Sequence, residues 1–370
     1  MPSNQQRIKV LHYVWWNNAH LTRLLELERA SGVNAHQSRG IIPTSVLRIL
    51  LSPLYPLGYR LLGYQILHLH WVAGHFKPSA SQGKWIAHFY YLWFRLYLQI
   101  AKLVRLKVVW TAHNVVPHDP VFPNDVLARK YLVQHIDKVF ALNETSRQKI
   151  ITDFESKNVM LIPVAEVIPQ PSESGQATRE RLGISMNDKL FSHFGHLRKY
   201  KGTELFIEAM AGHGDHIKFL IAGAPGATDF MARIHSAKDQ AKRNGVPLIY
   251  QEGFLLESEL ANLMQASDFI VCPFENINNS GFVNIAFSLG IPVILSDVEG
   301  LSWVPRDAAI WIQPNYDSAS LSAVIDRASA MRKEELVAIV QNAKAFAQLN
   351  SWDAYVTAQV NAYNELILKS

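Results

Sequence analysis

The chain contains 370 residues with a formal net charge of +5, and 49% of its residues are hydrophobic. This apolar content excludes a disordered chain, and the single cysteine, Cys272, excludes a disulfide framework and a multi-cysteine metal site. Residues 1–164 hold 19 Lys and Arg against 8 Asp and Glu, whereas residues 165–370 hold 17 against 23. A basic half joined to an acidic half predicts two domains with different partners.

The first half alternates short β-branched segments with helical stretches, a pattern typical of βαβ units in a parallel sheet. Its predicted strands are 8–14, 66–72, 106–115, 138–143 and 158–164. Two apolar stretches, 46–67 and 86–104, are interrupted by proline or charged residues. Because a membrane span needs about 20 mostly apolar residues, we expect buried or interfacial helices there.

The composition changes at 167–180, where Pro, Gly and Ser accumulate as in an interdomain linker. The alternation then restarts, and the predicted strands of the second half are 189–195, 218–223, 247–253, 268–274, 292–298 and 308–314. The chain ends in a predicted amphipathic helix, 352–368. We therefore predict an α/β fold with two doubly wound domains, 1–166 and 167–350, which face each other across a cleft, followed by a C-terminal segment, 351–370.

The first candidate site is the segment 194–202, which follows a predicted strand and opens a helix. Gly195 permits close backbone approach, and Arg198 and Lys201 supply positive charge. Backbone N–H groups and the helix dipole also favour anions at a helix N-terminus, so this segment suits a diphosphate. The alternative is an ordinary loop with solvated basic side chains.

The second candidate site is the polar loop that opens the predicted helix 280–290. It contains Asn276, Asn278, Asn279, Ser280 and Gly281. Free backbone N–H groups there suit the same phosphates or a sugar, and the alternative is helix capping alone.

A third group of titratable residues lies at the carboxyl end of the predicted strand 106–115 and just past it: His113, His118 and Asp119. Histidine and aspartate are common general bases, and burial tunes their pKa values. His68 and His70 share one face of a short strand, and we interpret them as mainly structural, with His70 a candidate cleft residue. Metal binding by these histidines is the alternative, although no His-Glu-x-x-His spacing is present.

The turn after the first strand, within 15–25, contains no glycine, so a dinucleotide fingerprint is excluded there. Asn17, Asn18 and His20 in this turn suit substrate hydroxyl groups, with helix capping as the alternative. The sequence also contains neither a GxxxxGK[ST] motif nor an Asp-x-Asp pair. A Walker-type ATPase and the usual carboxylate pair for a divalent ion are therefore not expected.

These motifs resemble those of GT-B glycosyltransferases that build bacterial exopolysaccharides. FGHLRKYKGTELFIEAM (194–210) resembles their G-x-(I/L)-R-x-Y-K-G segment, and NNSGFVNIAFSLGIPVILSD (278–297) resembles their S-G-x8-G-x-P-V segment. LHLHW (67–71) and VVWTAHNVVPHD (108–119) resemble their H-x-W and W-T-x-H-N-x-x-P-H segments. The H-N pair is also similar to the eukaryotic β-1,4-mannosyltransferase that acts on dolichol-linked chitobiose. The resemblance spans nearly the whole chain.

The resemblance implies a C-terminal domain that binds a nucleotide sugar, an N-terminal domain that binds the acceptor, and a last helix that crosses back onto the N-terminal domain. The implied donor-binding residues are Gly195, His196, Arg198, Lys201, Glu275, Asn279, Ser280 and Gly281. The implied acceptor-binding residues are Asn17, Asn18, His20, His70 and Trp71. Asp119, His113 or His118 would act as the base on the acceptor hydroxyl or orient the donor sugar. No metal or other cofactor is expected.

The chain departs from the retaining relatives, which carry two glutamates around the donor helix. Ile277 and Ile285 occupy those positions here, so we expect inversion, which needs a base on the acceptor side. The predicted function is transfer of a sugar from GDP-mannose or a UDP-sugar to a lipid-linked or oligosaccharide acceptor in polysaccharide or glycan biosynthesis. The alternatives are a sugar-nucleotide epimerase of the same architecture and a non-catalytic saccharide-binding or membrane scaffold protein.

The basic half also predicts where the enzyme acts. No Asp or Glu occurs between Glu28 and Asp119, and this stretch holds ten Lys and Arg together with the aromatic, apolar segments. Such a surface suits anionic lipids, whereas no recognised nucleic-acid module is present. The N-terminus lacks the apolar core of a signal peptide. We therefore expect a peripheral enzyme on the cytoplasmic, inner face of the membrane and no nucleic-acid partner.

Overall fold

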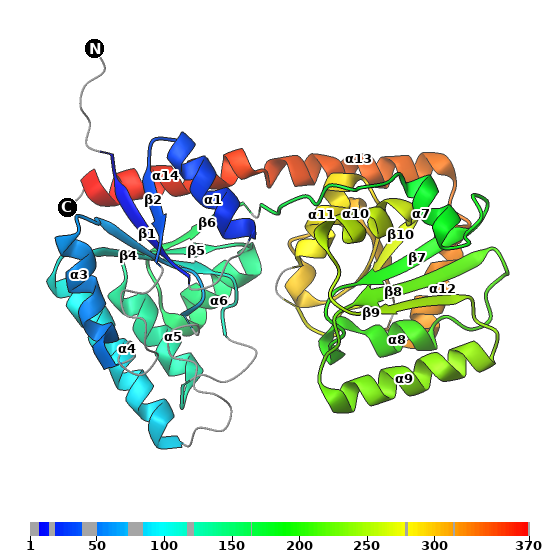
Figure 1. Cartoon of the computed structure of the whole chain (residues 1–370), viewed down its shortest axis with the longest axis horizontal. Coiled ribbons are helices and arrows are strands. Elements are labelled where there is room, and N and C mark those ends of the chain that lie inside the picture. The colour runs from blue at the N-terminus through cyan, green and yellow to red at the C-terminus, as the bar shows by residue number, and fades with distance from the viewer. Residues whose placement is uncertain are drawn as a thin grey trace, which may run out of the picture. The chain divides into compact units, whose positions relative to one another are not determined.

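The computed structural model describes residues 7–14, 19–38, 50–72, 84–116, 122–163, 165–277, 280–313 and 315–368 (Figure 1). The chain divides into two compact units. Unit 1 comprises Met1–Ala165 with Ser351–Ser370, and unit 2 comprises Glu166–Asn350. The division falls one residue before the boundary expected from the sequence, so Glu166 belongs to unit 2.

Unit 1 contains a parallel six-stranded sheet in the order β2-β1-β3-β4-β5-β6. The strands are β1 (Lys9–Tyr13), β2 (Asn34–Gln37), β3 (Ile66–Leu69), β4 (Lys107–Ala112), β5 (Lys138–Ala141) and β6 (Val159–Leu161). The helices are α1 (Ala19–Ala30), η1 (Ser52–Leu54), α3 (Tyr55–Leu61), α4 (Lys84–Leu103), α5 (Asp125–His135), α6 (Glu144–Phe154) and α14 (Trp352–Leu368).

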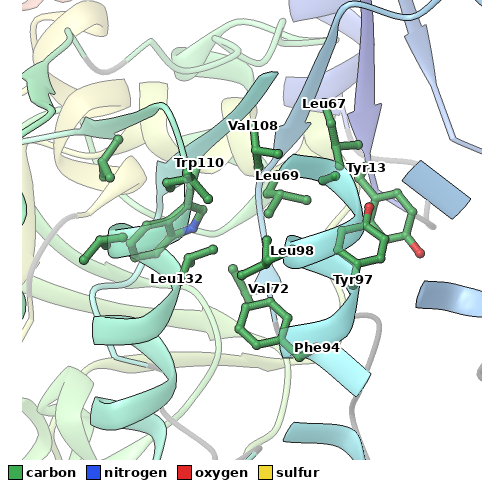
Figure 2. Close-up of a cluster of buried hydrophobic side chains, with 14 of the residues drawn as sticks. Tyr13, Leu67, Leu69, Val72, Phe94, Tyr97, Leu98, Val108, Trp110 and Leu132 are labelled. Atoms are coloured by element: carbon green, nitrogen blue, oxygen red, sulfur yellow. The ribbon is translucent and has the colours of Figure 1, made fainter. Parts of the chain in front are cut away.

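Helices cover both faces of this sheet. One face packs on α3, α4 and α5 through a large aromatic cluster that includes Tyr13, Phe94, Tyr97 and Trp110 (Figure 2). On the other face, α1 and α14 pack together over a second apolar cluster that includes Tyr363. The last helix of the chain therefore packs on the first sheet, as the sequence resemblance predicts.

Unit 2 contains a second parallel six-stranded sheet in the order β12-β11-β10-β7-β8-β9. The strands are β7 (Lys189–Phe194), β8 (Ile217–Gly223), β9 (Leu248–Glu252), β10 (Phe269–Cys272), β11 (Val293–Ser296) and β12 (Ile310–Ile312). The helices are α7 (Gly175–Arg181), η3 (Lys199–Lys201), α8 (Thr203–Glu208), α9 (Thr228–Arg243), α10 (Glu257–Ala266), α11 (Gly281–Leu289), η4 (Glu299–Leu301), η5 (Arg306–Ala308), α12 (Ser318–Ser329) and α13 (Lys333–Leu349).

Every strand predicted from the sequence is present, and the α/β fold of two doubly wound sheets is confirmed. The structure differs from the sequence prediction at β2 and at α7. The edge strand β2 lacks β-branched residues and forms through pairing with β1. Part of the predicted linker 167–180 forms α7, because the Ser174 side chain caps the helix by accepting from the backbone N–H of Ala177. Among the described residues, no helix is long and apolar enough to cross a membrane.

Candidate active site

The first part of the site is the turn that follows β7 in unit 2. Gly195 has a φ angle of +110°, which side chains other than that of glycine rarely tolerate. A Cβ atom at Gly195 would lie 2.9 Å from Cε2 of Phe282 and 3.2 Å from Nζ of Lys201. Glycine is therefore needed here, because it lets the end of β7 approach both side chains.

Lys201 is the buried cation of this turn. Its side chain is 8% exposed, and its ammonium lies 5.0 Å from the ring centre of Phe282 and 5.4 Å from that of Phe274. Among the described residues, no hydrogen bond or ion pair to this ammonium is found. Burial, with a smaller contribution from Arg198, lowers the pKa of Lys201. Since a buried charge without a counter-charge is costly, these surroundings suit an anionic ligand.

The other predicted residues of this turn, His196 and Arg198, are exposed and precede η3. Burial, then Arg198 and Lys201, lower the pKa of His196, so its ring is neutral at pH 7. The backbone N–H of Glu275 donates to the carbonyl of Tyr200 at 2.9 Å, which joins the β10–α11 loop to the β7–α8 turn. The side chain of Glu275 is exposed. The structure therefore brings two predicted donor segments, the β7–α8 turn and the β10–α11 loop, side by side.

The N-terminus of α11 forms the second part of the site. Ser280 is its N-cap residue, and Gly281 is its first residue. A Cβ atom at Gly281 would lie 3.0 Å from Oε1 of Glu166, so the carboxyl group of Glu166 lies against this helix end. Burial raises the pKa of Glu166 to about 7. Asn279, also predicted here, lies outside the described residues.

Asn284 lies one turn into α11 and was not predicted. Its side chain is 4% exposed, and neither its amide nitrogen nor its amide oxygen has a hydrogen-bond partner among the described residues. Buried amides are usually hydrogen-bonded, so Asn284 has unused capacity to bind a ligand. Sequence reasoning missed Glu166 because it lies in the expected interdomain segment, and missed Asn284 because a helix interior carries no binding motif.

In unit 1, the parallel strands β1, β3 and β4 bring four histidines into contact. The register aligns His12 with His68. Nδ1 of His12 lies 3.0 Å from Nε2 of His70, and Nδ1 of His70 lies 3.2 Å from Nε2 of His113. At the other end, Nε2 of His12 lies 2.7 Å from Oε2 of Glu28, and both side chains are fully buried.

A second branch reaches the same carboxylate from α14. The hydroxyl of Tyr363 donates to Oε1 of Glu28 at 3.1 Å, and it lies 2.6 Å from Nδ1 of His68. Nε2 of His68 lies 2.7 Å from Oγ1 of Thr111. His68 therefore has the structural role predicted from the sequence, whereas His70 contacts His113.

Three of these histidines are close enough together to share a metal ion. Ring nitrogens of His12, His68 and His70 lie within 4.8 Å of one another, which is compatible with a metal ion. However, both ring nitrogens of all three histidines already have protein partners. A metal ion would have to displace these hydrogen bonds, so the donor set fits a hydrogen-bonded network better than a metal centre.

Three of the predicted acceptor residues, His20, His70 and Trp71, contact His113. Its ring stacks on Trp71 with centroids 4.4 Å apart, and the His20 ring contacts its edge at 5.9 Å. Burial, with a smaller effect of His20, lowers the pKa of His113 to about 3, and burial lowers the pKa of His20 to about 4. These rings are therefore neutral at pH 7. Four further predicted residues, Asn17, Asn18, His118 and Asp119, lie outside the described residues.

Comparison with known proteins agrees with this geometry. Residues 175–346 match the family Glycosyl transferases group 1. The chain is 24% identical over 278 residues to a GDP-mannose:glycolipid 4-beta-D-mannosyltransferase of Xanthomonas campestris pv. campestris, and the match covers 72% of each chain.

Two solved structures share the fold. Sucrose-phosphate synthase from Thermosynechococcus elongatus superposes with a TM-score of 0.74 and 16% identity over 98% of this chain and 100% of its own. Anabaena Alr3699/HepE in complex with UDP superposes with a TM-score of 0.71 and 14% identity over 98% and 100%.

The two parallel sheets and these matches define a glycosyltransferase with the GT-B architecture. The segment that matches Glycosyl transferases group 1 lies in unit 2, which also contains Lys201 and the N-terminus of α11. Sugar transfer in glycan biosynthesis, predicted from the sequence, is confirmed, in preference to an epimerase or a non-catalytic scaffold.

Proposed function

We propose that this glycosyltransferase transfers mannose from GDP-mannose to a glycolipid acceptor, with inversion at the anomeric carbon and without a metal ion. The proposed binding of a nucleotide-sugar donor rests on the ammonium of Lys201, which is buried beside Gly195 without a counter-anion among the described residues. A nucleotide diphosphate supplies the missing negative charge. The choice of sugar and acceptor follows the printed activity of the Xanthomonas campestris relative.

The donor would bind in unit 2. Lys201 and Arg198 would neutralise the diphosphate as it leaves, which is the task that a divalent ion performs in many transferases. The free N–H groups at the start of α11 would bind phosphate or sugar oxygens. Because its pKa is about 7, Glu166 is partly protonated near neutral pH, which reduces its repulsion of the phosphates and lets it hydrogen-bond a sugar hydroxyl.

The acceptor would bind in unit 1, where His20, His70, Trp71 and His113 meet. Inversion requires a base that removes the proton of the acceptor hydroxyl. His113 and Asp119 are the candidates in this chain. At positions 277 and 285 the isoleucines offer no carboxylate, which favours inversion over the retaining arrangement.

A two-stage assay tests this function. Thermal shift with GDP, UDP and ADP should show selective stabilisation by GDP, because a ligand that binds only the folded state raises its stability. Nucleotide release from GDP-mannose should then depend on a polyprenyl-linked glycolipid, with anomeric configuration of the product determined by NMR. Stabilisation by UDP alone would refute the donor, and turnover without the acceptor would refute the transfer.

We also propose that unit 1 binds an anionic membrane surface on the cytoplasmic face. Large apolar side chains are exposed on α3 and α4, among them Leu61 (79% exposed), Trp85 (89%) and Leu103 (81%). A cavity of about 950 Å³ is lined by Arg60 and Lys102, the chain neighbours of Leu61 and Leu103. Its other charged side chains are Arg105, Lys107 and Lys138, with the carboxylates of Asp137 and Glu365. Apolar insertion together with basic side chains is the combination that holds peripheral proteins on anionic lipid.

Vesicle co-sedimentation tests the membrane proposal. The protein should sediment with vesicles that contain phosphatidylglycerol but not with pure phosphatidylcholine, and 0.5 M salt should release it. Leu61→Glu with Leu103→Glu should abolish sedimentation. Binding that is equal on both vesicle types and insensitive to salt would contradict the proposal.

A further inference from the structure

Four titratable side chains of unit 1 form a continuous hydrogen-bonded row. The row runs from Glu28 through His12 and His70 to His113, over contacts of 2.7, 3.0 and 3.2 Å. Glu28, His12 and His70 are all at most 2% exposed. Within the row, His113 is the half-buried member, and its ring contacts His20 and Trp71.

The direction of the hydrogen bonds follows from the buried carboxylate. Glu28 receives two donors, because the Tyr363 hydroxyl donates to its Oε1 and Nε2 of His12 lies against its Oε2. A carboxylate oxygen accepts, so the contact with Glu28 places a proton on Nε2 of His12; with its proton there, His12 accepts at Nδ1 from Nε2–H of His70. His70 then accepts at Nδ1 from Nε2–H of His113.

This order leaves the lone pair of His113 on Nδ1. Among the described residues, no hydrogen bond to this atom is found. Each imidazole in the row therefore donates its Nε2–H to the neighbour on the Glu28 side, and His12 and His70 accept at Nδ1 from the neighbour on the His113 side. Burial lowers the pKa of both His70 and His113, so a proton is not stable on either ring alone.

We propose that the row is a proton relay, in which Nδ1 of His113 takes the proton of the acceptor hydroxyl and the carboxylate of Glu28 finally holds it. This inference rests on the proposed inverting transfer. The acceptor oxygen forms its bond to the anomeric carbon as the bond from that carbon to the diphosphate oxygen breaks, and the electron pair leaves with the diphosphate.

The proton balance closes along the row. As His113 gains a proton on Nδ1, its Nε2 proton passes to Nδ1 of His70. The Nε2 proton of His70 passes to Nδ1 of His12, and the Nε2 proton of His12 passes to Glu28. The developing positive charge is thereby neutralised by the buried carboxylate instead of remaining on a desolvated imidazole. His113 is the catalytic base, whereas His12, His70 and Glu28 position it and accept its charge.

The branch through Tyr363 supplies a matched control, since it contacts the same carboxylate without lying between Glu28 and His113. Glu28→Gln keeps the size of the side chain but cannot take the proton. We expect it to lower kcat by about 100-fold or more, within the range of general-base catalysis, with the KM for the donor changed less than about twofold. Tyr363→Phe removes one hydrogen bond to Glu28 and should lower kcat less than about fivefold.

A measurement that does not require turnover tests the order of the protons directly. ¹⁵N NMR of histidine-labelled protein should show His12, His70 and His113 of the unaltered chain as Nε2–H tautomers at pH 7. In Glu28→Gln, this uniform order should be lost. The NMR result stands even if no sugar nucleotide proves to be a substrate, so failure of the relay and failure of the proposed function are distinguishable.

Two results would overturn the relay. The first is an Nδ1–H tautomer of His113 in the unaltered protein. In that tautomer Nδ1 already carries a proton, so it has no free lone pair to take the proton of the acceptor hydroxyl. The second is an equal loss of kcat in Glu28→Gln and Tyr363→Phe with equal lowering of Tm, because the network would then be only structural. Uniform Nε2–H tautomers, together with a selective loss of kcat in Glu28→Gln, support it.

Discussion

The substitution Gly202→Ala tests how the donor site is held together. Gly202 joins η3 to α8 at a φ angle of +72°. A Cβ atom there would lie 1.8 Å from the carbonyl oxygen of Pro273 and 2.9 Å from the hydroxyl of Tyr316. Since this carbonyl belongs to the backbone, the β10–α11 loop would have to retreat by at least about 1.6 Å to reach ordinary van der Waals contact.

The expected cost follows from the contacts that this retreat breaks. The Tyr316 hydroxyl donates to the Pro273 carbonyl at 2.7 Å, and the Glu275 N–H donates to the Tyr200 carbonyl at 2.9 Å. Their loss costs about 1 kcal/mol each. The left-handed conformation adds about 1–2 kcal/mol for alanine. We therefore expect Gly202→Ala to destabilise unit 2 by about 3–4 kcal/mol and to weaken binding of GDP.

Gly212→Ala is the matched control. Gly212 has a similar φ angle of +86°, but a Cβ atom there would meet nothing within 4 Å. In this variant the free energy of unfolding should fall only by the cost of the backbone conformation, about 1–2 kcal/mol, and the affinity for GDP should be unchanged. Urea unfolding and calorimetric titration with GDP measure both quantities. Equal losses of stability in the two variants, with unchanged GDP affinity, would show that Gly202 does not hold the two loops together.

Three further predictions concern unit 2. Lys201→Met should weaken GDP binding about 10- to 100-fold in calorimetric titration, because charged hydrogen bonds contribute about 1.5–3 kcal/mol. The exposed control Lys199→Met should change GDP affinity less than about threefold. Equal effects of the two substitutions would contradict a role of Lys201 in donor binding. Burial raises the pKa of Glu166 from 4.5 to about 7, so the folded state holds a proton that the unfolded state releases. The free energy of unfolding should therefore fall by about 3 kcal/mol as the pH rises from about 4.5 to about 7. Glu166→Gln should remove this fall in urea titrations, and an unchanged pH profile in this variant would refute the assignment. Arg179 is buried and donates to Asp268 and to three backbone carbonyls. Arg179→Met should therefore lower the free energy of unfolding of unit 2 by about 3–5 kcal/mol, as measured by urea unfolding. A loss below about 1 kcal/mol would contradict this prediction.

Local patterns in the sequence were sufficient for the fold. Short β-branched segments predicted eleven of the strands, because a strand buried on both faces needs a nearly continuous apolar run. The exception was β2, whose Asn-Ala-His-Gln segment carries no such signal and depends on its pairing with β1. Gly195 and Lys201 fall in the single predicted segment 194–202, and a Cβ atom at Gly195 would lie 3.2 Å from Nζ of Lys201.

The histidine row shows what sequence patterns do not contain. His70 and His113 were candidates, but Glu28 comes from α1 and Tyr363 from α14, 335 positions apart in the chain. Their contact exists because both helices pack on the same face of one sheet. Glu166 likewise meets Gly281 across more than a hundred positions.

The sequence by itself determined the two α/β units, the strands, the glycine turn of the donor site and the class of reaction. Only the tertiary structure decided which side chains meet: Glu28 with His12, Tyr363 with Glu28, and Glu166 with the N-terminus of α11. The physical reason is that hydrophobic periodicity and turn residues act over a few positions, whereas the partners of a buried polar group are set by the packing of distant segments.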